Sequence, residues 1–428
     1  MRSLSVPERI VMDSYRIAGI DVHKRMLAVV VADVAAGEGP YEFERREYGT
    51  TPDQLEQLRQ WLQQTEVRVA VMESTAQYWK PVWRALEGQC ELQLAQAQSN
   101  RAPRGRKRDF EDAERLVRRL VAGELRLSFV PDRQQRMWRM LTHAKYQATQ
   151  DRAKTLNQLE AFLEDAGLKL SGFVSTLKGV SSRRILEAVS KGESSPARLA
   201  ELADPGLKAT AAQLEDALRG AATMDPCCRK VLGIFLERLS GAERRIEQLH
   251  ELTAREMKAH NDAVVRLSEM PGLGVDSAQQ IIAELGPEAA TFPTAGDLAS
   301  WIGVCPGANI SANVPHGSHS PKGNVAMRRI LLVAAEAALK AKGSIFEKTY
   351  RRWVTRMKHK EAVWAVAHKM AKIIWKVLHD RVRYEERGLR TNPAAAKRRA
   401  SRLVAQLKRL GYSVQIMQVK GVGKEAIA

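Results

Sequence analysis

The chain has 428 residues, of which 44% are hydrophobic and 27% are charged, and its formal net charge is +19. This composition is typical of a globular protein with two or three domains, and the basic excess indicates a polyanionic partner, for which nucleic acid fits better than a membrane. The four cysteines contain no CxxC pair, and no signal-peptide core or membrane-length apolar run occurs, so we expect neither a zinc site nor disulfides, and we expect a cytoplasmic protein.

After a loose leader over residues 1–14, the segment 15–130 has the pattern of an α/β domain. Apolar runs of strand length alternate with helical spacing, and Gly37, Gly39 and Pro40 separate two of the runs. The expected strands cover 16–22, 26–34, 41–48, 67–73 and 91–95, and the expected helices begin near residues 51, 81 and 109. Three strands followed by alternating helices and strands is the order of a ribonuclease-H-like domain.

The segment 131–262 has a different, helical pattern. Apolar residues follow helical spacing from about 133 to 166 and again from 231 to 249. Two long amphipathic helices far apart in the sequence predict an antiparallel coiled-coil arm, with residues 167–226 as a helical insert at its tip. An ordinary helical bundle is the alternative.

The segment 263–385 is predicted to be a compact helical domain, followed by a basic tail over 386–428. Its turn Pro-Gly-Leu-Gly precedes a helix and resembles a helix-hairpin-helix, in which Gly272 and Gly274 would present backbone N–H groups to a phosphate. A plain turn explains these residues almost as well. A loop is expected over 299–327, followed by two helices over 328–342 and 361–379. The first of these helices looks buried. The tail either contacts nucleic acid or is a solvated helix face.

Four carboxylates stand out in the α/β segment: Asp21 inside a strand, Glu73 at the end of another, and Asp109 and Asp112 at the start of a helix. A carboxylate among apolar neighbours is costly unless it is paired or binds a metal. Two-metal phosphoryl transfer needs several converging carboxylates, and Mg²⁺ takes oxygen ligands. We therefore predict one magnesium site, although each helix-start acid taken alone could be a cap or a dipole partner.

Two further features accompany these acids. A basic loop directly before the Asp109 helix carries residues that could hold phosphates beside a metal site, namely Arg101, Arg104, Arg106, Lys107 and Arg108. His23 follows Asp21 closely, and a surface position suits it better than a role in the site.

Four stretches resemble one family. GIDVHK, VMESTAQYW and GRKRDFEDAERL resemble the DEDD motifs of the IS-one-ten type of insertion-sequence transposases, which are bridge-RNA-guided recombinases. PGLGVDSAQQIIAELG and the following LASWIGVCPGANISANVPHGSHSPKGNVAMRRILLVAA resemble that family's C-terminal transposase domain. The resemblance implies that the four carboxylates bind metal in a RuvC-like domain.

The resemblance also implies a serine nucleophile between the Trp-x-Gly-x-x-Pro stretch (301–306) and the Lys-Gly-Asn stretch (322–324). Ser311 matches best, with Ser318 and Ser320 as alternatives. A serine hydroxyl is a weak nucleophile at neutral pH and needs a base or a metal. In this region we also expect Lys322, Asn324 and Arg328 to contact nucleic acid.

The implied function is a DNA transposase or recombinase that cuts and rejoins strands for insertion-sequence mobility. Its implied partners are double-stranded target and donor DNA, a structured guide RNA and further copies of the chain as a dimer or tetramer, in the bacterial cytoplasm near the nucleoid. Alternatives are a RuvC-like endonuclease that uses water as nucleophile and a non-catalytic nucleic-acid-binding scaffold. A P-loop phosphotransferase is disfavoured because no GxxxxGK[ST] loop occurs.

Overall fold

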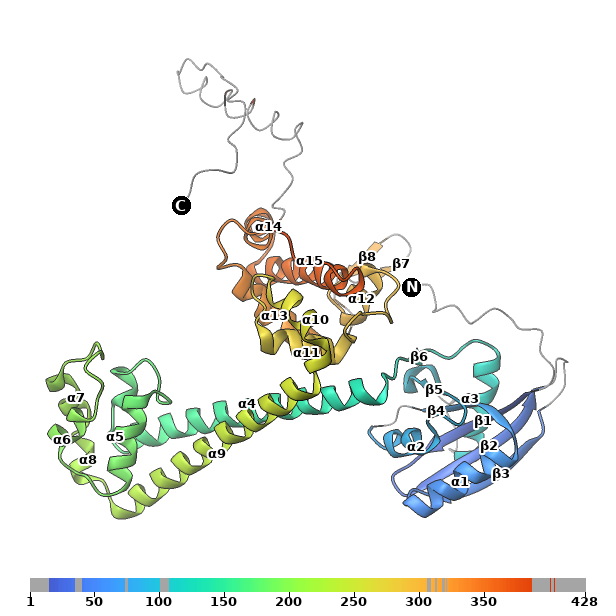
Figure 1. The fold of residues 1–428 in the computed structure, drawn as a ribbon, viewed down its shortest axis with the longest axis horizontal. Helices are drawn as coiled ribbons and strands as arrows, with labels where there is room; N and C mark the ends of the chain where they lie inside the picture. Colours follow the sequence, from blue (N-terminus) through green and yellow to red (C-terminus); the bar gives the residue numbers. More distant parts are fainter. Residues whose placement is uncertain are drawn as a thin grey trace. The chain divides into compact units, whose positions relative to one another are not determined.

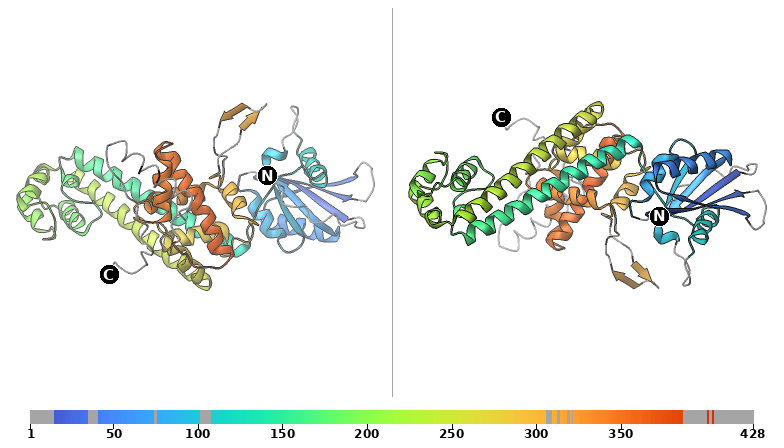
Figure 2. Two further views of the ribbon diagram at one scale, coloured as in Figure 1. Left: turned by 90° about the horizontal axis from the view of Figure 1, so that it is seen from above. Right: turned by 90° about the horizontal axis from the view of Figure 1, so that it is seen from below.

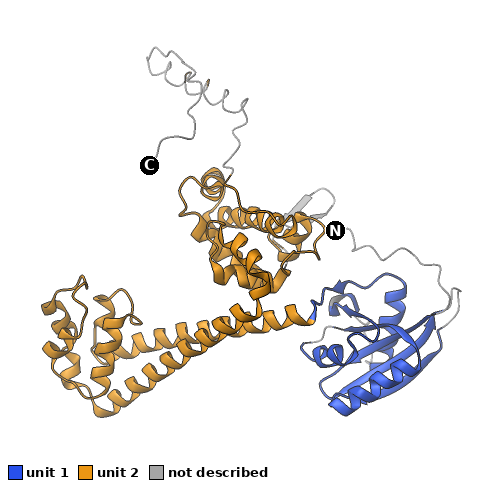
Figure 3. Cartoon of the chain, in the orientation of Figure 1, with its two compact units in different colours: residues 1–132 blue, residues 133–428 orange. Residues whose placement is uncertain are grey.

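The computed structural model describes residues 15–34, 41–73, 76–100, 108–305, 309–311, 314–317, 320, 322–386, 401 and 404. The chain divides into two compact units, Met1–Asp132 and Arg133–Ala428 (Figure 3). The finer division predicted at residues 14, 130, 262 and 385 stays a prediction. Within the described ranges, no helix has both the length and the apolar character that a membrane span requires.

The first unit contains a mixed six-stranded sheet (Figure 1). Its order is β3-β2-β1-β4-β5-β6, where β1 pairs antiparallel with β2 and parallel with β4. The strands are β1 (Tyr15–Val22), β2 (Met26–Val34), β3 (Phe43–Gly49), β4 (Val67–Glu73), β5 (Glu91–Ala95) and β6 (Leu127–Ser128). The predicted α/β order is confirmed and is consistent with a ribonuclease-H-like domain. The two-residue β6 is too short to leave a periodic pattern.

Helices cover both faces of this sheet because its central strands are apolar on both sides. On one face, α1 (Pro52–Gln64) and α2 (Trp79–Leu86) bury side chains such as Leu58 and Leu86 against Ile20 and Val29. On the other face, α3 (Asp109–Val121) buries Ala113 and Val117 against β1 and β2. A short 3-10 helix, η1 (Ala97–Asn100), precedes α3.

The second unit begins with two long helices that lie side by side in both figures, α4 (Arg133–Asp165) and α9 (Pro226–Glu256) (Figures 1 and 2). They run antiparallel, since the Trp138 indole nitrogen near the start of α4 donates to the carbonyl oxygen of Glu256 at the end of α9, at 3.3 Å. Between them in the sequence lie the helices of the insert, which share one hydrophobic core with Leu159 and Leu163 of α4 and with Leu232 and Leu236 of α9. The insert consists of η2 (Leu170–Gly172), α5 (Val180–Ser190), α6 (Pro196–Glu201), α7 (Ala211–Ala217) and α8 (Gly220–Thr223). The two long helices and the helical insert agree with the sequence pattern.

The remaining helices of this unit surround one hydrophobic core that includes Leu267, Ile282, Leu331 and Ile374. They are η3 (Lys258–His260), α10 (Asn261–Ser268), α11 (Val275–Leu285), α12 (Ala295–Ile302), α13 (Val325–Ala338), α14 (Ile345–Trp353) and α15 (His359–His379). A short hairpin joins α12 to α13 and consists of β7 (Asn309–Ser311) and β8 (Val314–Gly317).

Three expectations for this region need correction. The loop predicted over 299–327 contains the end of α12 and the β7–β8 hairpin, and α14 was not predicted. The helix predicted over 328–342 covers Val325–Ala338 and is not buried all round, because Leu332 and Val333 are 41% and 66% exposed. Val333 lies on the helix surface between Arg329 and Glu336, so these two charged residues mark the side that meets solvent. Most of the predicted basic tail lies outside the described residues.

Candidate active site

The alternation of side chains along β1 and β4 places two of the predicted acids on one face of the sheet. Ile17 of β1 and Val69 of β4 pack on the face of the sheet that α3 covers. Side chains alternate along a strand, and Asp21 and Glu73 each lie four residues further on, so both acids point to that same face. β1 and β4 are parallel, and Ile20 pairs with Met72. Asp21 and Glu73 are the next residues on their strands, so they lie at the same end of this strand pair. The strand positions therefore bring Asp21 beside Glu73.

The two helix acids come from the first turn of α3, which packs on that face. Asp109 and Asp112 are three residues apart and so lie on neighbouring positions of the helix surface. Asp112 is 8% exposed. Gly19 lies on β1 two residues before Asp21, and a Cβ there would lie 2.3 Å from the carbonyl oxygen of Ala113, so only glycine lets α3 approach this closely.

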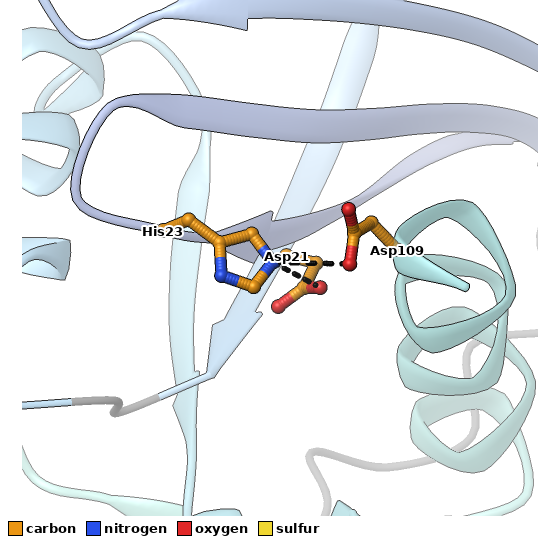
Figure 4. A group of neighbouring side chains, drawn as sticks. All are labelled: Asp21, His23 and Asp109. Atoms are coloured by element: carbon orange, nitrogen blue, oxygen red, sulfur yellow. Dashed lines mark hydrogen bonds and ion pairs between the residues drawn. The ribbon is translucent and has the colours of Figure 1, made fainter. Parts of the chain in front are cut away.

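His23 connects the strand acid to the helix acid (Figure 4). Its Nε2 atom lies 3.1 Å from Asp21 Oδ2 and 3.2 Å from Asp109 Oδ1. Carboxylates only accept hydrogen bonds when ionised, so a hydrogen bond to them requires a proton on Nε2, whereas a bound cation would require the lone pair of a ring nitrogen. His23 is therefore a member of the site. The sequence pattern favoured a surface position for His23, and its position two residues after a strand carboxylate, on the same side of the chain, was the available signal.

The other acids affect Asp21 electrostatically. Burial raises the pKa of Asp21, and the negative charges of Asp112, Glu73 and Asp109 raise this pKa further, whereas His23 lowers it. The predicted carboxylates of β1, β4 and α3 thus form one cluster. Like charges gathered in a partly buried site favour either protonation or a bound cation.

The donor set suits a divalent cation. One ligand atom each from Asp21, His23 and Asp109 lies within 4.8 Å of the others. Carboxylate oxygens are ligands for hard cations such as Mg²⁺, Ca²⁺ and Mn²⁺, and imidazole suits softer divalent ions. Glu73 and Asp112 do not belong to this close group of atoms, but each interacts electrostatically with Asp21.

Each of these two acids also has a partner within the first unit. Asn100 Nδ2 donates to Glu73 Oε2 at 2.9 Å, and Arg115 Nη2 donates to Asp112 Oδ1 at 2.6 Å. The sequence analysis did not single out Asn100 or Arg115. Arg115 stands three residues after Asp112 on the same helix, which was a usable signal.

Most of the predicted basic loop lies outside the described residues, namely Arg101, Arg104, Arg106 and Lys107. Arg108 is described, is exposed and directs Nη1 towards Glu111 Oε1 at 3.3 Å. Its predicted contact with nucleic acid stays a prediction.

The predicted serine residues belong to the second unit. Ser311 is the last residue of β7, where it is level with Val314 of β8. Ser318 lies outside the described residues. The Ser320 hydroxyl oxygen accepts a hydrogen bond from the Trp364 indole nitrogen at 3.1 Å, which fixes it to α15.

The two ends of the segment that carries Ser311 meet at a neck, which we define as residues 301–304 and 322–328. A Cβ on Gly323 would lie 2.0 Å from the carbonyl oxygen of Ile302. The backbone N–H of Asn324 donates to the carbonyl oxygen of Trp301 at 3.2 Å, and Arg328 Nη1 donates to that of Gly303 at 3.0 Å. The end of α12 and the start of α13 are therefore held together, and the hairpin projects from a closed base.

Glu284 of α11 connects this neck to α4 through hydrogen bonds. Its side chain is 3% exposed, and it accepts from Asn324 Nδ2 at 2.9 Å and lies 2.7 Å from His143 Nε2 of α4. Burial alone would raise the pKa of Glu284, but the hydrogen bond from His143, the charge of Arg139 and the bond from Asn324 lower the pKa on balance. The network joins α4, α11 and α13.

The residues predicted here as nucleic-acid contacts are thus partly engaged within the protein. Both functional groups of the Asn324 amide are used, since Oδ1 accepts from the backbone N–H of Met327 at 2.8 Å. The Arg328 guanidinium lies over the Trp364 ring, 4.7 Å from its centroid. Lys322 is exposed.

The two glycines of the predicted hairpin differ in their surroundings. Gly272 has φ +88°, and a Cβ there would lie 2.2 Å from the carbonyl oxygen of Ala334, so this glycine allows the turn to pack on α13. Gly274 is exposed, and a Cβ there would meet nothing within 4 Å. Gly274 is thus the more exposed of the two glycines.

A mixed sheet with four clustered carboxylates beside one helix is the arrangement of a DEDD-type transposase domain, and comparisons with known proteins agree. A model of DEDD transposases, described as "Transposase", matches residues 18–167, and the model described as "Transposase IS116/IS110/IS902 family" matches residues 264–351. The chain belongs to the IS110, or IS-one-ten, type of insertion-sequence transposases.

One curated relative is described as "Insertion element IS110 uncharacterized 43.6 kDa protein" and comes from Streptomyces coelicolor. It is 32% identical to this chain over 124 residues, which is 28% of this chain and 30% of the relative. The match therefore spans less than a third of the relative's length.

Proposed function

We propose that this chain cuts and rejoins DNA strands during transposition of an insertion sequence. The observation that carries the proposal is the cluster of Asp21, Glu73, Asp109 and Asp112 on one face of the sheet, at the end of two parallel strands. A basic chain with a net charge of +19 suits nucleic-acid substrates, and family membership supports DNA as the substrate.

The four carboxylates would hold Mg²⁺, with His23 placed between Asp21 and Asp109. When bound, such an ion acts as a Lewis acid at a phosphoryl oxygen and stabilises charge that develops during phosphoryl transfer. Glu73 and Asp112 are held in place by Asn100 and Arg115, so the carboxylates keep their orientation before the substrate arrives.

Ser311 is the proposed nucleophile. Its hydroxyl oxygen forms a bond to the phosphorus of the scissile phosphate, the bond from phosphorus to one deoxyribose oxygen breaks, and the departing oxygen takes up a proton while the serine proton passes to solvent. The phosphoserine–DNA linkage keeps the energy of the broken phosphodiester for rejoining to another strand. The neck of residues 301–304 and 322–328 supports this role, since it gives the hairpin a fixed base.

Sequence reading is assigned to a structured guide RNA that pairs with target and donor DNA, since a protein can delegate recognition to base pairing. In this scheme the α10–α11 turn and the basic loop contact phosphates, the paired helices α4 and α9 form a coiled-coil arm, and the arm assembles a homo-oligomer. This arrangement is supported by the family resemblance and by the charge of the chain.

The test uses the full chain, with the RNA that co-purifies from cells carrying its element, and labelled DNA that spans the element's ends. A denaturing gel should show DNA covalently attached to protein in the presence of Mg²⁺. Ser311→Ala should lose both cleavage and the adduct while DNA and RNA binding persist. Ser318→Ala and Ser320→Ala are the matched controls, and loss of the adduct in one of them instead would move the nucleophile.

Two other outcomes identify the alternatives. Cleavage without any adduct would indicate an endonuclease that uses water. Asp21→Asn should abolish cleavage but not binding, whereas Asp53→Asn, an exposed acid at the start of α1, should behave as wild type. Unchanged behaviour of Asp21→Asn would mean that the carboxylates are incidental.

A further inference from the structure

Asn100 occupies a buried position beside the carboxylate cluster. Its residue exposure is 2%, and it is the last residue of η1, between β5 and α3. Its Nδ2 atom donates to Glu73 Oε2 at 2.9 Å. Burying an amide is favourable only when its polar atoms are paired, so this contact constrains both side chains.

The same residue is tied to the second helix acid. Arg115 Nε donates to the backbone carbonyl of Asn100 at 3.2 Å, and Nη2 of that guanidinium donates to Asp112 Oδ1 at 2.6 Å. The Arg115 side chain is 18% exposed. A chain of hydrogen bonds through Asn100 and Arg115 therefore connects Glu73 at the end of β4 to Asp112 on α3.

The other half of the Asn100 amide is not satisfied. A carboxylate oxygen accepts only, so Nδ2 has to face Glu73, and Oδ1 is then buried with no hydrogen-bond partner among the described residues. A buried carbonyl left unpaired costs about 1–3 kcal/mol. An unpaired polar atom at such a cost is unusual in a core and requires an explanation.

We propose that Asn100 is a positioning residue of the carboxylate site: it fixes the orientation of Glu73 and, through Arg115, the placement of Asp112 relative to Glu73. This inference rests on the proposed metal-dependent function. Groups that orient metal ligands typically change metal affinity by about 10–100-fold when they are removed.

The chain contains a matched control for this arrangement. In β5, Gln93 Nε2 donates to Glu91 Oε1 at 2.8 Å, and Gln93 Oε1 is also buried without a partner among the described residues. This pair repeats the amide–carboxylate contact on the same sheet, and neither residue belongs to the acidic cluster. Glu91 is exposed and Gln93 is half-buried, so this contact is less buried than that of Asn100 with Glu73. Removing the Gln93 amide tests whether the loss of an amide–carboxylate contact on this sheet is by itself enough to lower Mn²⁺ affinity.

The experiment measures Mn²⁺ binding to the full chain by titration calorimetry, together with the melting temperature. Asn100→Leu keeps the branched shape of the side chain and replaces the amide with methyl groups, and Gln93→Met removes the amide at the control pair. We expect Asn100→Leu to bind Mn²⁺ about 10–100-fold more weakly than wild type and Gln93→Met to bind it normally. The side chain of serine is too short for its hydroxyl to reach Glu73, so Asn100→Ser should show the same loss of Mn²⁺ affinity. This variant replaces Asn100→Leu in the experiment if the leucine variant does not fold.

The outcomes separate this inference from the proposed function. Wild-type Mn²⁺ affinity in folded Asn100→Leu or Asn100→Ser, with only a lower melting temperature, would overturn the positioning role. Absence of Mn²⁺ binding in wild type, or unchanged binding in Asp21→Asn, would overturn the metal site itself. Equal losses in the Asn100 and Gln93 variants would show a general loss of structure and would also overturn the inference.

Discussion

Gly19 sets the distance between the strand that carries Asp21 and the helix that carries Asp109 and Asp112. A Cβ at this position would lie 2.3 Å from the carbonyl oxygen of Ala113, and ordinary contact begins at 3.4 Å, so Gly19→Ala requires α3 to retreat by about 1.1 Å. The obstacle is helix backbone and cannot rotate away as a side chain would. The displacement therefore reaches the acids at the start of α3.

The magnitude follows from two opposing effects. Alanine in place of glycine in a strand gains about 0.5–1 kcal/mol because the unfolded chain loses freedom. Overpacking of a well-filled core costs about 1–3 kcal/mol, so it outweighs that gain. For catalysis, a misplacement of about 1 Å can reduce the rate about 100-fold. We expect Gly19→Ala to be mildly destabilised and to lose about 100-fold in adduct formation.

The assay combines urea denaturation, Mn²⁺ titration and the denaturing gel for the protein–DNA adduct. Gly49→Ala, on β3 of the same sheet, is the control, because its Cβ would meet only the Gln54 side chain at 3.2 Å, which can shift by the few tenths of an ångström required. Wild-type Mn²⁺ affinity and adduct yield in Gly19→Ala would refute the reasoning that the close approach of β1 and α3 defines the site.

Three further changes test other parts of the structure. Gly323→Ala would place a Cβ 2.0 Å from the carbonyl oxygen of Ile302 and open the neck, so the adduct should fall about 100-fold while Mn²⁺ binding, measured by titration, stays normal. Glu284 has a lowered pKa in the folded protein, so its stabilising effect is present above the unfolded pKa of about 4.3 and is lost as pH falls through the folded pKa. Glu284→Gln should therefore reduce the loss of melting temperature between about pH 5 and pH 3, and an identical acid profile would contradict this account. Ser320→Ala removes the acceptor of the Trp364 indole and should cost about 1 kcal/mol in unfolding free energy without reducing the adduct.

Patterns in the sequence predicted the parts of the site that depend on local geometry. The helix period determines that Asp109 and Asp112 are neighbours, and it acts over a few residues, so it is visible without a structure. That Asp21 and Glu73 share a face follows instead from the pairing of β1 with β4. The order of strands and helices likewise indicated an α/β domain.

The sequence by itself therefore determined the class of fold and the candidate carboxylates. Tertiary structure decided which residues orient those carboxylates, as the contact of Asn100 with Glu73 and the approach of Ala113 to Gly19 show. It also decided that Asn324 is engaged with Glu284 within the protein. The physical reason is that each of these contacts joins residues far apart along the chain, and no periodicity within one helix or strand encodes the distance between two elements.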